Sequence, residues 1–216
     1  MFNIRQVIKT LKQKRKVFTS EADLQLELAW VIKELYPHAI VRREYCPDFN
    51  LNMHIDILVI INNRWIPIEL KYKTKKIEFS DKDGCYYNLK EQSAQDTGCY
   101  DYIKDISRIE EIKENKKEFN VGYTIFITND ELYKKGPRNN EVSYVQFSLK
   151  DNRENGIGGN LNWSKPISGE RNKPIELKDH YEIKWEKQPF SELEIKEETN
   201  KYIKSKTFYI LYNEIK

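Results

Sequence analysis

The sequence is poor in the residue types that mark several classes of protein. It has three cysteines (Cys46, Cys85 and Cys99), which form no Cys-x-x-Cys motif, and only three histidines, so a structural zinc site is not expected. No apolar run approaches the length of a membrane span, and the first residues lack the apolar stretch of a secretory signal peptide. We therefore expect a reduced, cytoplasmic protein that does not enter a membrane.

A strong net charge is absent as well. Lys and Arg total 37 and Asp and Glu total 34, so binding to nucleic acid would depend on local basic patches. The length of 216 residues and the apolar fraction of 39% suit one domain with a sizeable core. We expect a single domain over residues 1–216, with a basic N-terminal helix over 1–18, a core over 19–130 and a β-rich extension over 131–216. The basic helix is either an ordinary solvated helix or an arm that contacts phosphates.

The apolar periodicity predicts an α/β fold whose core runs in the order helix, three antiparallel strands, helix, strand. The expected elements are a helix from its N-cap Ser20 to about Leu35, a strand over 39–45, a hairpin over 54–73, a helix over 89–117 with a break near 97–98, and a strand over 121–128. Short β-like runs follow at 142–149, 181–185 and 207–212.

The hairpin carries an acid in an unusual place. Residues 55–61 are apolar throughout except for Asp56, which is the pattern of a buried strand with one carboxylate inside it. Burial of an isolated carboxylate costs free energy unless a cation meets it. Asn62 and Asn63 suit a two-residue turn, because asparagine tolerates the positive φ angles that such turns require.

That turn determines which residues of the two strands face each other. It places Asp56 directly opposite Glu69 and His54 opposite Lys71, and opposite residues share one face with Cβ atoms roughly 5 Å apart. Lys71 shares the face of Glu69 because the two are two positions apart on one strand. Two carboxylates this close repel each other unless a divalent cation lies between them, so the hairpin predicts a metal site.

A third acid is predicted from helical phase. Glu21 lies inside the apolar stripe of its helix, three residues before Leu24 and seven before Leu28, whereas Glu27 lies at the edge of that stripe. Two interpretations stay open at this point. Glu21 either lies at an exposed helix end and favours the helix dipole, or points over the sheet towards Asp56.

The Glu-x-Lys pattern occurs twice, so it is weak evidence by itself. The pentapeptide PIELK at 67–71 recurs at 174–178, where no apolar strand with an acid precedes it. Glu176 and Lys178 are therefore predicted to be surface residues of a β-hairpin. The first copy is the better candidate for a site because Glu69 is predicted to lie opposite Asp56.

The combination Asp56…Glu69-Leu70-Lys71 resembles the PD-(D/E)xK signature of the restriction-endonuclease-like nuclease superfamily, whose core has the same order of elements. The segments SEADLQLELAW, IELKYK, QDTGCYDYIKDISRIE and GYTIFITND resemble little-characterised microbial proteins assigned to this superfamily, over most of residues 19–130. The aspartate is kept, but residues 50–54 (NLNMH) replace a literal Pro-Asp before the strand. The resemblance implies a restriction-endonuclease-like core with a β-rich C-terminal elaboration.

The resemblance also implies a metal-dependent nuclease that hydrolyses phosphodiester bonds in DNA or RNA, in defence, restriction or repair. Asp56, Glu69 and the backbone carbonyl of Leu70 would bind Mg²⁺ or Mn²⁺, with Glu21 contributing directly or through a water. Lys71 would orient the attacking water and offset charge in the transition state. Membership in this superfamily is also compatible with a homodimer.

Five residues are expected to line a groove for the nucleic acid, although an ordinary solvated surface explains them equally well: Lys73, Lys75, Gln95, Lys104 and Arg108. The polar side of the helix that carries Asp105 and Arg108 is expected to face solvent or this groove. Two other classes of function stay open, a catalytically silent nucleic-acid-binding module and a protein-interaction module on the same fold. Binding of nucleic acid without metal-dependent cleavage would indicate the former.

Overall fold

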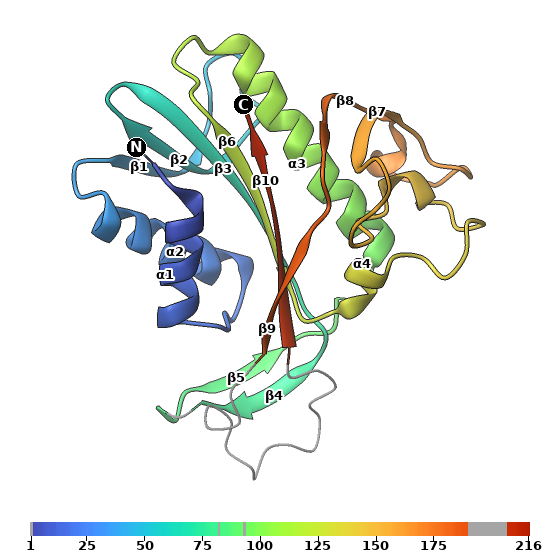
Figure 1. The fold of residues 1–216 in the computed structure, drawn as a ribbon, viewed down its shortest axis with the longest axis horizontal. Helices are drawn as coiled ribbons and strands as arrows, with labels where there is room; N and C mark the ends of the chain where they lie inside the picture. Colours follow the sequence, from blue (N-terminus) through green and yellow to red (C-terminus); the bar gives the residue numbers. More distant parts are fainter. Residues whose placement is uncertain (1, 82, 93, 190–206) are drawn as a thin grey trace.

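The computed structural model describes residues 2–81, 83–92, 94–189 and 207–216, and these form a mixed α/β structure (Figure 1). The helices are α1 (Ile4–Lys14), α2 (Glu21–Leu35), α3 (Gln95–Asn115) and α4 (Glu131–Lys135). The central sheet contains, in spatial order, β1 (Ile40–Tyr45), β2 (Ile55–Ile61), β3 (Arg64–Lys73), β6 (Gly122–Thr128), β10 (Thr207–Ile215) and β9 (Trp185–Pro189). Two further pairs are β4 (Ile77–Ser80) with β5 (Tyr86–Leu89), and β7 (Ile157–Leu161) with β8 (Ile175–Tyr181).

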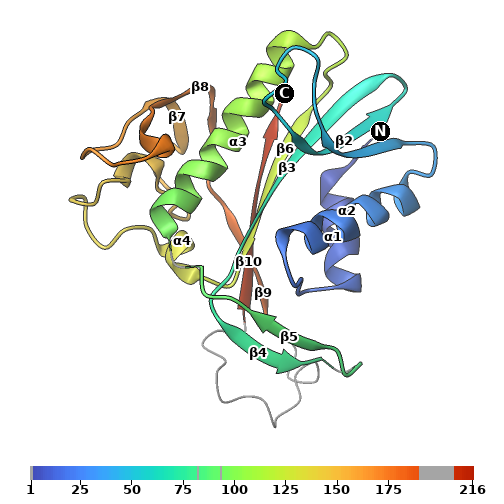
Figure 2. The same cartoon turned by 180° about the vertical axis from the view of Figure 1, so that it is seen from behind.

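The central sheet is mixed, because β3 runs parallel to β6 while its other pairings are antiparallel. Figures 1 and 2 show α1 and α2 on one side of the sheet and α3 on the other. Ile68, Leu70 and Tyr72 of β3 pack in the core that contains the apolar residues of α1 and α2. Side chains alternate along a strand, so Glu69 and Lys71 are directed towards α3.

The predicted hairpin is confirmed in its turn and its register. Asn62 and Asn63 have φ angles of 51° and 59°, as a two-residue turn of this kind requires. The register places Ile57 opposite Ile68, and Asp56 and Glu69 are the next residues along the two strands. The predicted start of α2 is confirmed too, because the Ser20 side chain accepts a hydrogen bond from the Asp23 N–H at 3.1 Å.

The helix predicted over 89–117 begins later than expected, at Gln95, and continues without a break through Gly98. Residues 86–89 instead form β5, which pairs with β4 in a hairpin that the sequence patterns did not predict. Gly98 is required by packing and not by a change of backbone direction. A Cβ atom at this position would lie 2.2 Å from the hydroxyl oxygen of Tyr133 in α4.

The predictions for the last third of the chain are mixed. Residues 142–149 contain a short 3-10 helix (Val145–Phe147) and no strand. The apolar side chains of Phe147 and Leu149, which suggested a strand, are buried in the core beside α3 without pairing in a sheet. The run 181–185 is the end of β8 and the start of β9, with residues 182–184 between them. The run 207–212 is confirmed as a strand, and β10 pairs with β6 inside the central sheet.

Across the described ranges, no helix combines the length and the apolar character needed to cross a membrane.

Packing around Gly98 gives a test of the fold. We expect Gly98→Ala to lower the free energy of unfolding by about 1–3 kcal/mol, because the added methyl group overlaps a buried tyrosine. At an unhindered helical position the same change would be stabilising by up to about 1 kcal/mol. Urea unfolding measures the difference. Removal of the obstructing hydroxyl in Gly98→Ala/Tyr133→Phe should restore part of the loss, and an equally large loss in the double variant would contradict the packing described here.

Candidate active site

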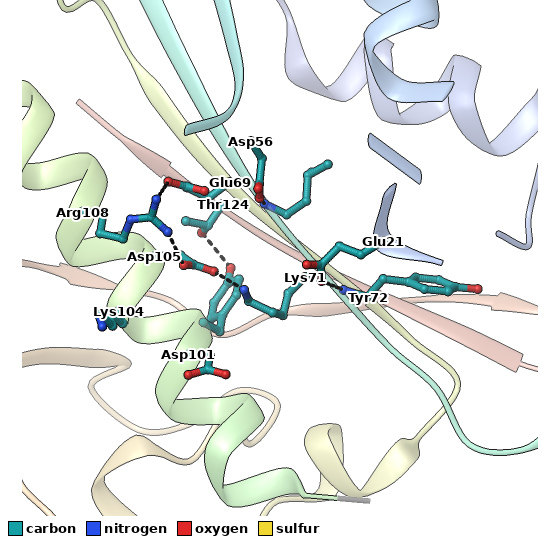
Figure 3. A network of polar contacts seen from close by, with 12 residues as sticks. Glu21, Asp56, Glu69, Lys71, Tyr72, Asp101, Lys104, Asp105, Arg108 and Thr124 are labelled. Atoms are coloured by element: carbon teal, nitrogen blue, oxygen red, sulfur yellow. Dashed lines mark hydrogen bonds and ion pairs between the residues drawn. The ribbon is translucent and has the colours of Figure 1, made fainter. Parts of the chain in front are cut away.

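Two carboxylates accept hydrogen bonds from backbone N–H groups of β3, near the start of β2 (Figure 3). Asp56 Oδ2 accepts a hydrogen bond from the Leu70 N–H at 2.6 Å, and Glu21 Oε2 accepts one from the Tyr72 N–H at 2.7 Å. In a strand, the N–H and C=O groups of one residue point to the same neighbouring strand, so the Leu70 carbonyl lies on this edge as well. The first residue of α2 therefore reaches the site strand, which favours the second of the two interpretations given for Glu21.

A second group of charges lies between β3 and α3. Lys71 Nζ is 3.0 Å from Asp105 Oδ2, and Arg108 Nη2 is 3.2 Å from Glu69 Oε1. Arg108 Nη1 is also 3.4 Å from Asp105 Oδ1. Glu69 is 1% exposed and Asp105 is 4% exposed, so both carboxyl groups are buried.

Together these two groups form what we call the acid–base cluster, which consists of Glu21, Asp56, Glu69, Lys71, Asp105 and Arg108. Four acids are matched by two bases, so the cluster carries an excess of two negative charges when every group is ionised. An excess of buried negative charge is unfavourable unless protons or a cation reduce it.

The pKa values of the acids reflect this excess. Burial raises the pKa of Asp56 to about 6, and the charges of Asp105 and Glu21 add to the effect. Burial also raises the pKa of Glu69 well above its usual value, with Asp105 the next contributor. The pKa of Asp105 is raised by burial as well, although Lys71 and Arg108 oppose the change.

The pKa values of the two bases are raised, which keeps both side chains charged. Burial alone would lower the pKa of Lys71, but the charges of Asp105 and Glu21 hold it above its usual value. The pKa of Arg108 is raised by Glu69 and Asp105, against the effect of burial. Lys71 is therefore a cation at neutral pH and a hydrogen-bond donor, and it is not a candidate general base.

The two acids predicted to face each other across the hairpin each bind another group. Figure 3 shows the Glu69 carboxylate turned towards Arg108, while Asp56 binds the Leu70 N–H. Within the described residues, no three histidine, cysteine, aspartate or glutamate side chains gather as a metal-holding group. A metal ion here would rely on two carboxylates, a carbonyl oxygen and ligands from water or substrate.

The residues of the cluster fit a small divalent cation in charge and in ligand type. Glu69 Oε1 and Asp105 Oδ2 are buried and make no hydrogen bond of normal geometry, although each lies at ion-pair distance from a base. Mg²⁺ prefers carboxylate and carbonyl oxygens and keeps several waters. The protein ligands would be Asp56, Glu69 and the Leu70 carbonyl, with Glu21 beside them on the same strand edge.

The expected groove residues lie in different surroundings. Lys75 Nζ is 3.2 Å from Asp130 Oδ1, and Gln95 Nε2 donates to Asp130 Oδ2 at 2.5 Å. Asp130 is the buried N-cap residue of α4, so both side chains contact this cap. Lys104 is exposed on α3, and Lys73 is half-buried at the end of β3.

Arg108 and Asp105 do not face solvent in the way expected for their side of α3. The expectation is wrong for Asp105, which is buried, while Arg108 is directed into the acid–base cluster. Asp105 belongs to the apolar stripe of its helix, three residues after Tyr102 and four before Ile109. The helical-phase criterion that selected Glu21 would therefore have selected Asp105 too.

Gln25, one helical turn after Glu21, is a second residue that the sequence analysis missed. It is buried, and its Nε2 donates to the Asp56 carbonyl oxygen at 2.8 Å and to Glu44 Oε1 at 2.5 Å. Its Oε1 accepts from Arg43 Nε at 3.0 Å. Gln25 therefore anchors the main chain that carries Asp56. A glutamine between apolar helix residues gave no specific signal of this role.

The second PIELK copy behaves as predicted. The side chains of Glu176 and Lys178 on β8 are 69% and 54% exposed, and they lie 3.9 Å apart in a surface ion pair. The prediction that they are surface residues is confirmed.

Neither a protein-family model, nor a curated protein, nor a solved structure matches this chain. The acid–base cluster is consequently the observation from which we infer a function.

The raised pKa of Asp56 gives a test of the cluster through its effect on stability. The folded-state pKa of about 6 lies above the roughly 3.9 of an unfolded aspartate, so stability falls as the pH rises through this window. We expect Asp56→Asn to raise the Tm by a few degrees at about pH 8 without metal, on a scale of about 2–4 °C per kcal/mol. The gain should shrink as the pH falls and disappear below about pH 3, where the wild-type carboxyl is protonated in both states.

Asp23 provides a control of opposite sign. Burial would raise its pKa, but the Arg15 guanidinium at 2.7 Å and the Thr19 N–H hold the pKa of Asp23 below its usual value. Asp23→Asn should therefore lower the Tm at neutral pH, and the loss should shrink as the pH falls. Thermal unfolding followed by circular dichroism across the pH range measures both profiles. A lower Tm for Asp56→Asn at about pH 8 would show that Asp56 is not held against an excess of negative charge.

Proposed function

We propose that this protein is a Mg²⁺-dependent nuclease that hydrolyses phosphodiester bonds in DNA, with RNA as the second substrate class and Mn²⁺ as an alternative metal. The observation that carries the proposal is the meeting of Asp56 and Glu21 with the Glu69-Leu70-Lys71 segment of β3 in one cluster with excess negative charge. The order α2, β1, β2, β3, α3, β6, with the β4–β5 hairpin inserted between β3 and α3, supports a restriction-endonuclease-like core, which agrees with the resemblance to the PD-(D/E)xK superfamily.

The roles of the residues follow from their contacts. A bound Mg²⁺ supplies Lewis-acid polarisation of the scissile phosphate and a water of lowered pKa. Asp56 and Glu69 supply carboxylate ligands, and Glu21 holds the edge of β3 beside the Leu70 carbonyl. Lys71, kept protonated by Asp105, donates a hydrogen bond to the attacking water and offsets the negative charge that develops on the phosphate.

The proposal places the protein in a reducing compartment, the cytoplasm. All three cysteines lie in the described part of the chain and are free, which is consistent with that setting. The superfamily resemblance also makes a homodimer part of the proposal, with DNA as the principal partner.

The duplicated pentapeptide supplies a matched control for a cleavage assay. Wild-type protein with Mg²⁺ or Mn²⁺ is incubated with double-stranded, single-stranded and branched DNA and RNA. We expect Lys71→Ala and Asp56→Ala to reduce the cleavage rate by about 100-fold or more, because each removes an interaction with the reacting groups. Lys178→Ala changes the same residue type as Lys71→Ala, and Glu176→Ala removes an acid from the exposed second copy, so both should leave the rate unchanged.

Two outcomes would count against a nuclease. Cleavage at the wild-type rate in both Lys71→Ala and Asp56→Ala would remove the cluster from the mechanism. Metal-independent DNA binding by the wild-type protein, without cleavage of any substrate, would favour a catalytically silent nucleic-acid-binding module.

A further inference from the structure

Arg108 lies at the solvent side of the buried acids. Its Nη2 is 3.2 Å from Glu69 Oε1, and its Nη1 is 3.4 Å from Asp105 Oδ1 (Figure 3). Its Nη2 also donates to the carbonyl oxygen of His54. The Arg108 side chain is 25% exposed, whereas the Glu69 side chain is 1% exposed. Arg108 is thus the cation that compensates the Glu69 carboxylate in this state of the protein.

The contact between Arg108 and Glu69 lacks a directed hydrogen bond. The two atoms are at ion-pair distance, yet Glu69 Oε1 has no hydrogen-bond partner of normal geometry. The guanidinium directs its hydrogen bonds to the His54 carbonyl and to Asp105 Oδ1 instead. An attraction of this kind depends on charge more than on direction, so another cation can replace it.

A metal ion and Arg108 would compete for the same carboxylate. A divalent cation bound to Glu69 would lie a few ångströms from the guanidinium, and like charges at that distance repel each other. Release of Arg108 from Glu69 would not leave it without a counter-charge, because Asp105 Oδ1 is 3.4 Å from its Nη1. Arg108 can therefore give up its contact with Glu69 to a divalent cation and still keep Asp105 as a counter-charge.

We propose that Arg108 is the resident counter-ion of Glu69 in the metal-free protein, and that a divalent cation binds by displacing it. This exchange sets the metal affinity of the site, and it explains why the Glu69 carboxylate is turned towards Arg108. The inference rests on the proposed function, since it takes the Asp56–Glu69 region as the metal site.

Binding of Mn²⁺ to the full chain, without nucleic acid, tests the exchange. Isothermal titration calorimetry is run at about pH 8, above the pKa of about 6 of Asp56. We expect Arg108→Gln to bind Mn²⁺ about 10-fold more tightly than wild type, because a repelling positive charge is gone. Arg108→Lys keeps the charge and should stay within about threefold of wild type. Lys113→Gln removes a charge from the exposed end of α3, where Lys113 pairs with Asp179, and should also stay within about threefold.

A measurement on the wild-type chain covers the case in which Arg108→Gln does not fold. Titration with diamagnetic Mg²⁺ should shift the Nε–H resonance of Arg108, identified by its loss in Arg108→Lys, with the dissociation constant that calorimetry gives for Mg²⁺. An unmoved resonance, or a Mn²⁺ affinity in Arg108→Gln equal to or weaker than that of wild type, would overturn the exchange while leaving the metal site intact. Absence of Mn²⁺ binding by wild type at millimolar concentration would overturn the proposed nuclease function together with the exchange.

Discussion

Two backbone N–H groups of β3, at Leu70 and Tyr72, lie beyond the point where β2 can pair with them, and the site is organised around this constraint. A buried backbone donor needs an acceptor, and here the acceptors are the carboxylates of Asp56 and Glu21. One comes from the start of β2 and the other from the first turn of α2. The need to satisfy two backbone donors thus brings acids from two separate elements to one strand edge.

The alternation of side chains along β3 then determines which charges meet on the other side. Leu70 and Tyr72 contribute to the core with α1 and α2, so Glu69 and Lys71 have to project towards α3. Two residues of α3 pair with them, Asp105 with Lys71 and Arg108 with Glu69. The resulting cluster holds four acids and two bases in largely buried positions, which lowers the stability of the fold.

Local chemistry made the hairpin predictable, and long-range packing made its surroundings hard to predict. Asn62 and Asn63 specify a turn, and a turn specifies a register, so Asp56 and Glu69 could be placed as neighbours from sequence. Helical phase identified Glu21. The partners of Lys71 and Glu69 depend on how α3 docks on the sheet, which no short pattern encodes. The same holds for β10, whose place beside β6 depends on a pairing between residues that are 81 (Tyr209 and Thr128) to 93 (Ile215 and Gly122) positions apart in the chain.

The position of β10 has a consequence for synthesis on the ribosome. β6 lies between β3 and β10, so the sheet is complete on one side of β6 as soon as α3 and β6 have been made. The other side stays an open edge of buried, apolar strand until residues 207–215 have left the exit tunnel. An unpaired edge of this kind can pair with the wrong chain, and it must be protected while the intervening segments are translated. The nascent chain therefore carries this unpaired edge at a stage when the residues of the acid–base cluster have all been synthesised.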